Sequence, residues 1–339
     1  MKFTYAYGVL PHEFTKDFRF GLQVAEDCGT IKASVWEATA IRIADDIVAA
    51  LRPTFNPNST TNAGVDDPLT LADFDLIANL RASRTPKEIS AFGSGRSTNG
   101  ELFACEDNFY PVTVIGDDIK NYSLAPAGFE SSFALYVGQP NKFKYIDPNL
   151  PDERSVDPNL EALGYAMFLN QPRPDLFDGV QWTIQSLKAK FQRPRPFQAV
   201  LETNSKGFWH HLSQTAHSPS LPSGHCVETL FGALNAYVGF ASNSSSIWQQ
   251  YRNELAAWSA QVADRRVYAG LHYPSDSFAS WICVSHLIPV LFSSGDHSQL
   301  ARDCLIRSIQ ASECWTLAQN IRVFAPAIDR LSALNERLT

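Results

Sequence analysis

The sequence lacks the features typical of membrane, secreted and nucleic-acid-binding proteins. Its first residues, Met1–Tyr5, contain no apolar run of the kind that forms a signal peptide. The most apolar segment, 278–292, is shorter than the roughly 20 residues that a membrane span requires, and Pro289 and several polar residues interrupt it. The net charge of −7 argues against broad nucleic-acid binding. These absences predict a cytoplasmic or otherwise soluble protein with no nucleic-acid or membrane partner.

The chain also lacks a C-x-x-C pair, a phosphate-binding loop, internal repeats and low-complexity segments. Its six cysteines are scattered, which in a chain of this length favours reduced, buried thiols over a disulfide framework. The glycine-rich segment 93–100 has no Lys-Ser/Thr ending, so a flexible loop is favoured there over a nucleotide site.

What the chain does have is helical periodicity. With 339 residues, of which 45% are hydrophobic and 19% charged, it can form one large folded domain or two ordinary ones. Residues 18–24 alternate as in a short strand, but the other periodic segments predict an all-α helical bundle. Helices are expected at 31–51, 69–82, 159–170, 176–192, 225–241, 245–268, 275–292, 297–310, 312–323 and 326–337.

The expected helices divide the chain into two regions. Residues 1–150 are expected to form a mostly helical N-terminal region of unknown role, and residues 151–339 a helical-bundle domain. Within the second region, residues 193–224 form a linker rich in proline, serine and histidine. A linker of that length inside a compact domain is often functional.

The chain is organised around the stretch Leu221–Cys226. Pro222, Ser223 and Gly224 are turn and N-cap residues, so the first free N–H groups of the next helix fall near Gly224 and His225. A helix N-terminus offers unpaired donors and partial positive charge to a tetrahedral oxyanion, and His225 could exchange a proton with it. Ser-Gly caps also begin many ordinary helices, so the stretch is informative only together with its surroundings.

Three basic residues flank this stretch, and two of them lie at positions where a charge is costly. Lys188 lies beside the apolar stripe of its expected helix, and Arg266 continues the apolar face of its own. Buried cations need a partner, so both predict an anion in the core. Lys188 could instead reach the surface, and Arg266 could pair with a structural aspartate. Arg195 lies between two prolines that stiffen its loop, although it could be an ordinary loop arginine.

His272 and Asp276 form the last constellation. Pro274 suits a helix start, so His272 lies just before the next helix and Asp276 in its first turn. Asp276 could accept the Nδ1–H of His272, fix its tautomer and leave Nε2 as a nucleophile or a metal ligand. Alternatively, Asp276 is a carboxylate that complements the helix dipole.

Together these residues resemble the tripartite signature of the vanadium-dependent haloperoxidase and type 2 phosphatidic acid phosphatase superfamily. The signature reads Lys-x6-Arg-Pro, then Pro-Ser-Gly-His, then Ser-Arg-x5-His-x3-Asp. It is matched over roughly residues 176–285 by Lys188 with Arg195-Pro196, by Pro222-Ser223-Gly224-His225, and by Arg266, His272 and Asp276. Arg265 stands where the signature has serine, and a second guanidinium there could alter the rim of the site.

The resemblance implies a catalytic helical bundle, at 151–339, that binds phosphate or vanadate beneath a long active-site loop. Lys188, Arg195 and Arg266 would contact the oxygen atoms of the anion through charge-assisted hydrogen bonds. Ser223 and the Gly224 N–H would add donors. One site serves both anions because vanadate mimics the five-coordinate transition state of phosphoryl transfer.

The catalytic roles are implied in the same way. His225 would be the general acid and base, and Asp276 would orient His272. His272 would either bond to vanadium, as the only metal ligand from the chain, or attack phosphorus to form a phosphohistidine.

Two activities follow from the resemblance. The expected one is a vanadium-dependent haloperoxidase that oxidises halide with hydrogen peroxide to hypohalous acid. The alternative is a soluble acid phosphatase acting on a phosphate monoester. Aromatic and histidine residues in 203–221 suit a halide site, although they could simply pack the loop, and the triplet Arg195-Pro196-Phe197 is similar to acid phosphatases. A non-catalytic anion-binding scaffold is disfavoured because every matched catalytic position is filled. A homo-oligomer is compatible with the sequence.

Overall fold

The structure is a computed structural model of the chain, and it is all-α over the residues that it describes. These residues form helices, turns and short connections and contain no strand, which confirms the predicted fold class. They are 31–52, 67–82, 174–196, 218–243 and 270–336, together with positions 199, 253, 256, 257, 259, 260, 262–264, 266 and 267.

Most of the expected helices are present within a few residues of their expected bounds. They are α2 (Ala33–Leu51), α3 (Pro68–Ala82), α8 (Pro174–Phe191), α10 (Gly224–Asn243), α12 (Pro274–Leu291), α13 (Gly295–Ala311), α14 (Glu313–Ala318) and α15 (Ala325–Glu336), with a 3₁₀ helix η2 at Arg322–Phe324. The described positions between 253 and 267 are also helical. The expected helix at 159–170 and the expected strand at 18–24 lie outside the described residues.

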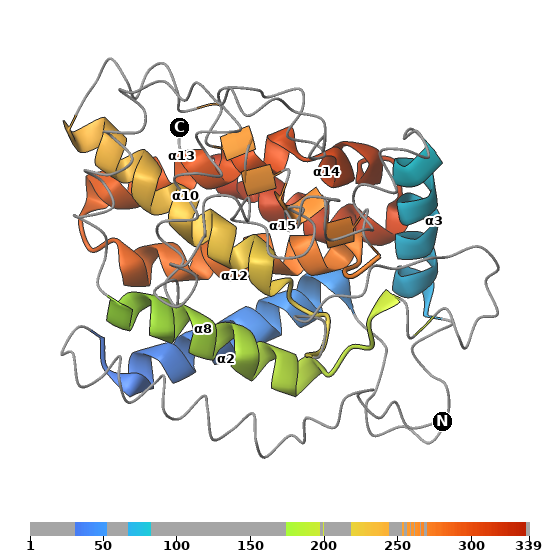
Figure 1. Cartoon of the computed structure of the whole chain (residues 1–339), viewed down its shortest axis with the longest axis horizontal. Helices are drawn as coiled ribbons and strands as arrows, with labels where there is room; N and C mark the ends of the chain where they lie inside the picture. Colours follow the sequence, from blue (N-terminus) through green and yellow to red (C-terminus); the bar gives the residue numbers. More distant parts are fainter. Residues whose placement is uncertain are drawn as a thin grey trace, which may run out of the picture.

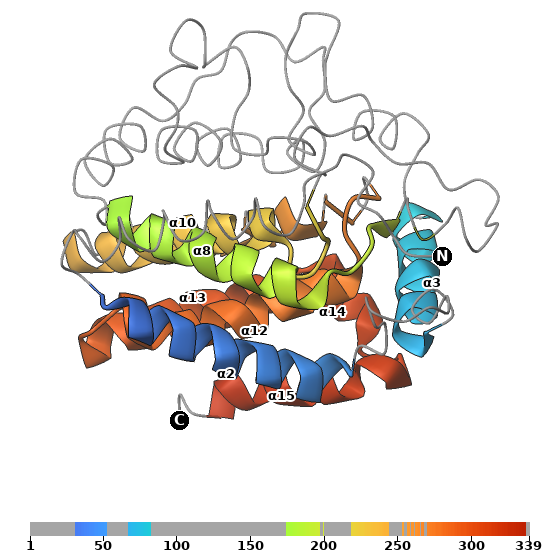
Figure 2. The ribbon, with the colours of Figure 1, turned by 90° about the horizontal axis from the view of Figure 1, so that it is seen from below.

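Helix α12 is the centre of the bundle. It is buried on all sides from Pro274 to Val284, and it contacts α2, α3, α10, α13 and α15. Figure 1 shows α10 running across the molecule above α8 and α2, with α3 standing at one end. Turned by 90°, Figure 2 shows α8 and α10 on one side of α12 and α13, and α2 and α15 on the other. The first residues of α12 are therefore held in place by packing from several directions.

The N-terminal helix α2 joins this core through a close contact with α8. Trp36 of α2 is fully buried, and a Cβ atom added at Gly179 of α8 would overlap its indole ring. Only glycine lets the two helices approach so closely. Helices α2 and α3 thus share one core with the later helices, while the division of the chain near residue 150 stays a prediction because residues 83–173 are not described.

One expected helix ends early. The helix expected at 312–323 stops at Ala318, and η2 follows after a turn. Trp315 and Phe324 both contact the ring of Phe278, at centroid distances of 6.0 Å and 5.3 Å. Residues nine positions apart lie on opposite faces of a continuous helix. The break therefore allows both aromatic rings to pack on Phe278, which the local periodicity could not indicate.

The expected irregular linker at 193–224 also contains a helical turn. The N–H of Ala199 donates to the carbonyl of Arg195 at 3.0 Å, and Pro196 is helical. Proline is tolerated in the first turn of a helix because its missing N–H has no partner to lose there. The linker is therefore less irregular than its composition indicated.

Two other expectations from the composition can be compared with the described residues. Cys226, Cys283, Cys304 and Cys314 are buried free thiols, as predicted, while Cys28 and Cys105 lie outside the described residues. Among the helices that are described, none combines the length and apolar character needed to cross a bilayer.

The contact between α2 and α8 can be tested with a Gly179→Ala substitution. We expect the free energy of unfolding, measured by chemical denaturation, to fall by about 1–3 kcal/mol because the added methyl group overpacks the core at Trp36. Gly295→Ala is the matched control, since nothing lies within 4 Å of a Cβ added at that helical position. Equal stability of the two variants would show that α2 does not pack on α8 in this way.

Candidate functional site

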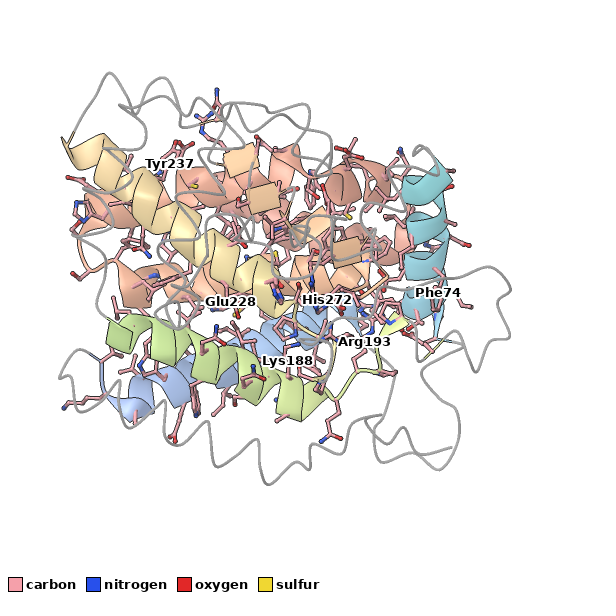
Figure 3. All side chains as sticks on the ribbon, in the orientation of Figure 1. Phe74, Lys188, Arg193, Glu228, Tyr237 and His272 are labelled. Carbon is pink, nitrogen blue, oxygen red and sulfur yellow. The ribbon has the colours of Figure 1, made fainter. Side chains whose placement is uncertain are left out.

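The predicted site residues lie where three helices begin or end. Lys188 is in the last turn of α8, Gly224 is the first residue of α10, and His272 lies just before α12. Figure 3 shows Lys188 and His272 near one another at this junction, beside Arg193. The fold thus brings together residues that are up to 88 positions apart in the sequence, from Lys188 to Asp276.

His272 is held in one tautomer by its two partners. Its Nδ1 lies 3.0 Å from Asp276 Oδ2, and its Nε2 lies 2.9 Å from a terminal nitrogen of Arg195. A carboxylate only accepts and a guanidinium only donates, so Nδ1 carries the proton and Nε2 carries the lone pair. Burial, followed by the positive charge of Arg195, lowers the pKa of His272 well below its usual value. The imidazole is therefore neutral, with an unprotonated Nε2.

Asp276 does more than complement the helix dipole. Its Oδ2 accepts hydrogen bonds from His272 and from the backbone N–H of Tyr273, at 3.0 Å and 2.9 Å. Its Oδ1 accepts one from Arg193 at 3.0 Å. The two oxygens are thus occupied by different partners, which fixes the plane of the carboxylate and, through it, the orientation of the imidazole ring.

Arg195 is a buried residue with several partners and not an exposed loop arginine. Its Nε donates to the carbonyl of Ser218 at 2.9 Å, and a terminal nitrogen donates to the carbonyl of Leu271 at 2.9 Å as well as to His272. Burial, followed by repulsion from Arg266, lowers the pKa of Arg195 to about 9. The guanidinium remains charged at neutral pH and faces the Nε2 atom of the imidazole.

Lys188 and Arg266 add two more buried cations to the same region. Lys188 donates to the carbonyl of Pro219 and does not extend to the surface. Burial, followed by Arg195, lowers the pKa of Lys188 well below its usual value. The carbonyl of Arg266 accepts the backbone N–H of His272 at 3.3 Å, so the main chain of Arg266 lies next to that of His272.

The start of α10 completes the site. Ser223 is fully buried, and its hydroxyl has no hydrogen-bond partner among the described residues. His225 is half-buried, and burial followed by Arg266, His272, Arg195 and Lys188 lowers its pKa well below the usual value. A Cβ at Gly224 would lie 3.9 Å from the Lys188 side chain. The N-terminus of α10, with His225, and the side chain of Lys188 are therefore close neighbours.

Together, the buried cations and the start of α10 give this region a positive potential and hydrogen-bond donors that are available to a ligand. Cations that lower one another's pKa values indicate that positive charge is in excess there. A buried anion would relieve this repulsion and accept hydrogen bonds from the Ser223 hydroxyl and from the first N–H groups of α10. The arrangement is therefore suited to a tetrahedral oxyanion. Within the described parts of the chain, no group of three or more His, Cys, Asp or Glu side chains could hold a metal ion.

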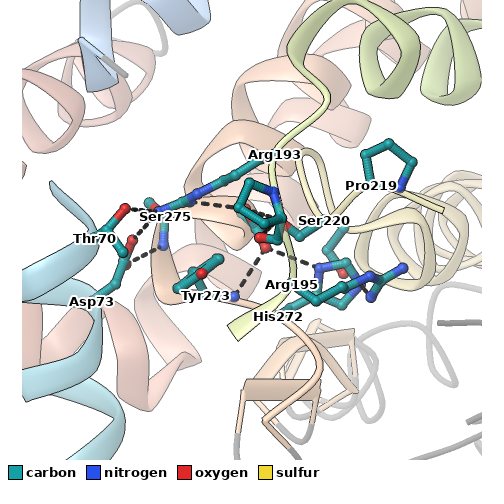
Figure 4. Close-up of polar contacts among 12 residues, drawn as sticks. Thr70, Asp73, Arg193, Arg195, Pro219, Ser220, His272, Tyr273 and Ser275 are labelled. Carbon is teal, nitrogen blue, oxygen red and sulfur yellow. Dashed lines mark hydrogen bonds and ion pairs between the residues drawn. The ribbon is translucent and has the colours of Figure 1, made fainter. Parts of the chain in front are cut away.

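Two charged residues of this region had no role in the sequence-based prediction. Arg193 donates to Asp276 and to Asp73 of α3, at 3.0 Å and 2.8 Å, and its guanidinium carbon lies 3.8 Å from the ring centre of Tyr273 (Figure 4). Asp73 lies four residues after Leu69 and before Ile77, on the buried face of α3. The rule that identified Lys188, a charge on an apolar helix face, would have found Asp73 as well.

Comparison with known families agrees with this geometry. A sequence profile of the PAP2 superfamily matches residues 163–295, which include every predicted site residue. For this segment the match confirms the predicted superfamily, which includes haloperoxidases and acid phosphatases, and it extends beyond the residues that carry the motifs. No curated protein matches the chain. Catalysis of the phosphatase or haloperoxidase type is therefore supported.

Anion binding by the buried lysine can be tested with Lys188→Met, which keeps the length of the side chain and removes its charge. We expect the dissociation constant for inorganic phosphate, measured by titration calorimetry, to rise about tenfold or more, as for loss of a hydrogen bond to a charged group. Lys190→Met is the matched control, because Lys190 is in the same turn of α8 but exposed. If both variants bind phosphate equally well, Lys188 does not contact the anion.

Proposed function

We propose that the chain, whose residues 163–295 form a PAP2 superfamily domain, hydrolyses phosphate monoesters with His272 as the nucleophile. The observation that carries this proposal is the neutral imidazole with its lone pair on Nε2, fixed by Asp276 on one side and Arg195 on the other. An ordinary histidine is mostly protonated below pH 6.5 and loses its nucleophilic lone pair. The lowered pKa of His272 keeps this one reactive in mild acid, as an acid phosphatase requires.

Binding of the substrate would begin at the three cations. The phosphate oxygens would take hydrogen bonds from Lys188, Arg195 and Arg266 and from the Ser223 hydroxyl. Arg195 would then turn its terminal nitrogen from His272 Nε2 to the phosphate, which exposes the lone pair to phosphorus. The same cations would stabilise the charge that the equatorial oxygens carry in the transition state.

The first chemical step is an in-line displacement on phosphorus. The lone pair of His272 Nε2 forms the P–N bond while the P–O bond to the ester oxygen breaks. His225 gives its proton to the departing oxygen, so the alcohol leaves neutral. The bound dianion raises the pKa of His225 by offsetting the nearby positive charges, which supplies the protonated form needed at this step.

The second step regenerates the enzyme. His225, now neutral, takes a proton from a water molecule as that water attacks the phosphorus of the phosphohistidine. The P–N bond breaks, its electron pair returns to Nε2, and inorganic phosphate is released. Nδ1 of His272 keeps its proton throughout and donates it to Asp276, so the imidazole remains in the tautomer that the first step needs.

Haloperoxidase activity is the second candidate, because the same donors fit vanadate. Three buried cations, a buried hydroxyl without a partner among the described residues and a neutral Nε2 match the charge, shape and coordination of that anion. Bound vanadate would supply the Lewis acid that activates hydrogen peroxide toward halide. Lys188, Arg195 and Arg266 would hold its oxygens, and His272 would bind it. The aromatic and histidine residues that favoured this activity lie mostly at 203–217, outside the described residues.

One purified sample distinguishes the two activities. We expect hydrolysis of p-nitrophenyl phosphate near pH 5–6, competitive inhibition by vanadate, and a phosphohistidine signal by ³¹P NMR after a rapid alkaline quench. His272→Ala should lower kcat by on the order of a thousandfold or more, since it removes the nucleophile. His297→Ala, an exposed position in α13, should not.

Two other results would contradict the phosphatase proposal. The sample is also loaded with vanadate and assayed with hydrogen peroxide, bromide and a phenol acceptor. Halogenation that depends on His272, without hydrolysis of a range of phosphate monoesters, would support the haloperoxidase. Absence of both activities in a sample that binds phosphate would leave an anion-binding protein without the proposed catalysis.

A further inference from the structure

We propose that Asp73 and Arg193 are positioning residues for His272, so that helix α3, which lies outside the superfamily match, forms part of the catalytic machinery. The inference rests on the proposed function, since it concerns the nucleophile of that reaction. Neither residue belongs to the tripartite signature, and neither is among the residues proposed to bind phosphate. They act on the imidazole through the carboxylate of Asp276.

Arg193 is a fully buried bridge between two carboxylates. One terminal nitrogen donates to Asp276 Oδ1 at 3.0 Å and to the hydroxyl of Ser275 at 2.6 Å. The other donates to Asp73 Oδ2 at 2.8 Å and to the hydroxyl of Thr70 at 3.3 Å. Only a guanidinium can place two nitrogens in this fixed fork geometry. The side chain therefore sets the distance between α3 and the first turn of α12.

Asp73 anchors that bridge at the start of α12. Its Oδ1 accepts the backbone N–H of Ser275 at 2.9 Å, and its Oδ2 accepts the hydroxyl of the same residue. These contacts join residues 202 positions apart. Asp73 thus binds both the guanidinium of Arg193 and the first turn of α12, which carries Asp276. Figure 4 shows Arg193 and Ser275 side by side next to Asp73.

The consequence for catalysis follows from the two oxygens of Asp276. Arg193 occupies Oδ1, which leaves Oδ2 directed at Nδ1 of His272. Without the guanidinium, Oδ1 keeps only the Ser220 hydroxyl at 3.5 Å, and the carboxylate can turn about its terminal torsion. His272 then donates its Nδ1–H to a carboxylate held only by the N–H of Tyr273 and the long Ser220 contact, and the tautomer with its proton on Nε2 becomes more accessible. That tautomer cannot attack phosphorus.

A purely structural role for this buried cluster predicts something different. A buried ion pair is weak evidence for stability, and a fold can often replace one at little cost. If Arg193 only held α3 in place, its loss would lower the stability of the fold. The tautomer of His272 in the folded molecules would be unchanged.

The first test uses Arg193→Gln and Arg193→Lys. We expect kcat for p-nitrophenyl phosphate to fall about tenfold to a hundredfold in Arg193→Gln, the range for loss of an outer partner of a site histidine. KM and the inhibition constant for phosphate should not change, since Arg193 does not contact the anion. Arg193→Lys keeps the charge but not the fork, so we expect partial recovery. It also keeps the test available if the glutamine variant does not fold.

The decisive readout is the tautomer itself. In protein labelled with ¹⁵N at its eight histidines, the His272 signals, assigned with His272→Ala, should indicate the Nδ1–H form in the wild type. The Nε2–H form should appear in Arg193→Gln. Arg330→Gln is the matched control, because Arg330 also pairs with an aspartate, Asp46, that contacts a histidine, His286, away from the site. A wild-type tautomer in folded Arg193→Gln overturns the proposal.

A double-mutant cycle tests the role of Asp73. Asp73→Asn alone should lower kcat, by less than Arg193→Gln does, because Arg193 keeps its contact with Asp276. In the Arg193→Gln background the same substitution should have a smaller effect on kcat than in the wild type, since Asp73 acts partly through the guanidinium and only partly through its direct contacts with Ser275. Effects that multiply would show that Asp73 acts independently, which overturns its assignment.

Failure of this inference can be told apart from failure of the proposed function. The tautomer measurement needs no turnover, so it decides the role of Arg193 even if no phosphate ester is hydrolysed. Hydrolysis by the wild type, together with an unchanged tautomer in Arg193→Gln, would reject the positioning role and leave the phosphatase proposal intact.

Discussion

The buried carboxylate of Asp276 is the contact on which the rest of the site depends. A carboxylate without water needs several donors to remain charged, and this one receives them from both sides. Its backbone carbonyl also accepts the N–H of Ser223 at 3.3 Å and the hydroxyl of Ser280 at 2.8 Å. One residue therefore orients the imidazole of His272, caps α12 and ties α12 to the tip of α10.

The fold places excess positive charge in its interior, and this excess is the physical basis for function. Lys188, Arg195 and Arg266 lower one another's pKa values or those of the neighbouring histidines. Such repulsion opposes folding, so an oxyanion that binds among these cations would also stabilise the folded chain. Function and stability are thus linked through the same three side chains.

Much of this could be predicted from the sequence, because helices and motifs are local. Apolar residues at intervals of three and four positions indicated most of the helices, and costly charges on apolar faces indicated Lys188 and Arg266. The spacing of His272 and Asp276, one helical turn apart, was enough to predict their contact. The break after Ala318 could not be predicted, since it depends on two aromatic rings packing on Phe278, which lies elsewhere in the chain.

The helices and the chemical groups that converge at the start of α10 could be inferred from the chain alone, because both follow from periodicity and from spacing within a few turns. The bridge of Arg193 between Asp73 and Asp276, and the contact of Arg195 with the lone pair of His272, are visible only once the chain is folded. Asp73 and Ser275 are 202 positions apart, and their pairing depends on how α3 packs against the buried end of α12. Burial and charge pairing arise between distant segments, so no local pattern specifies them.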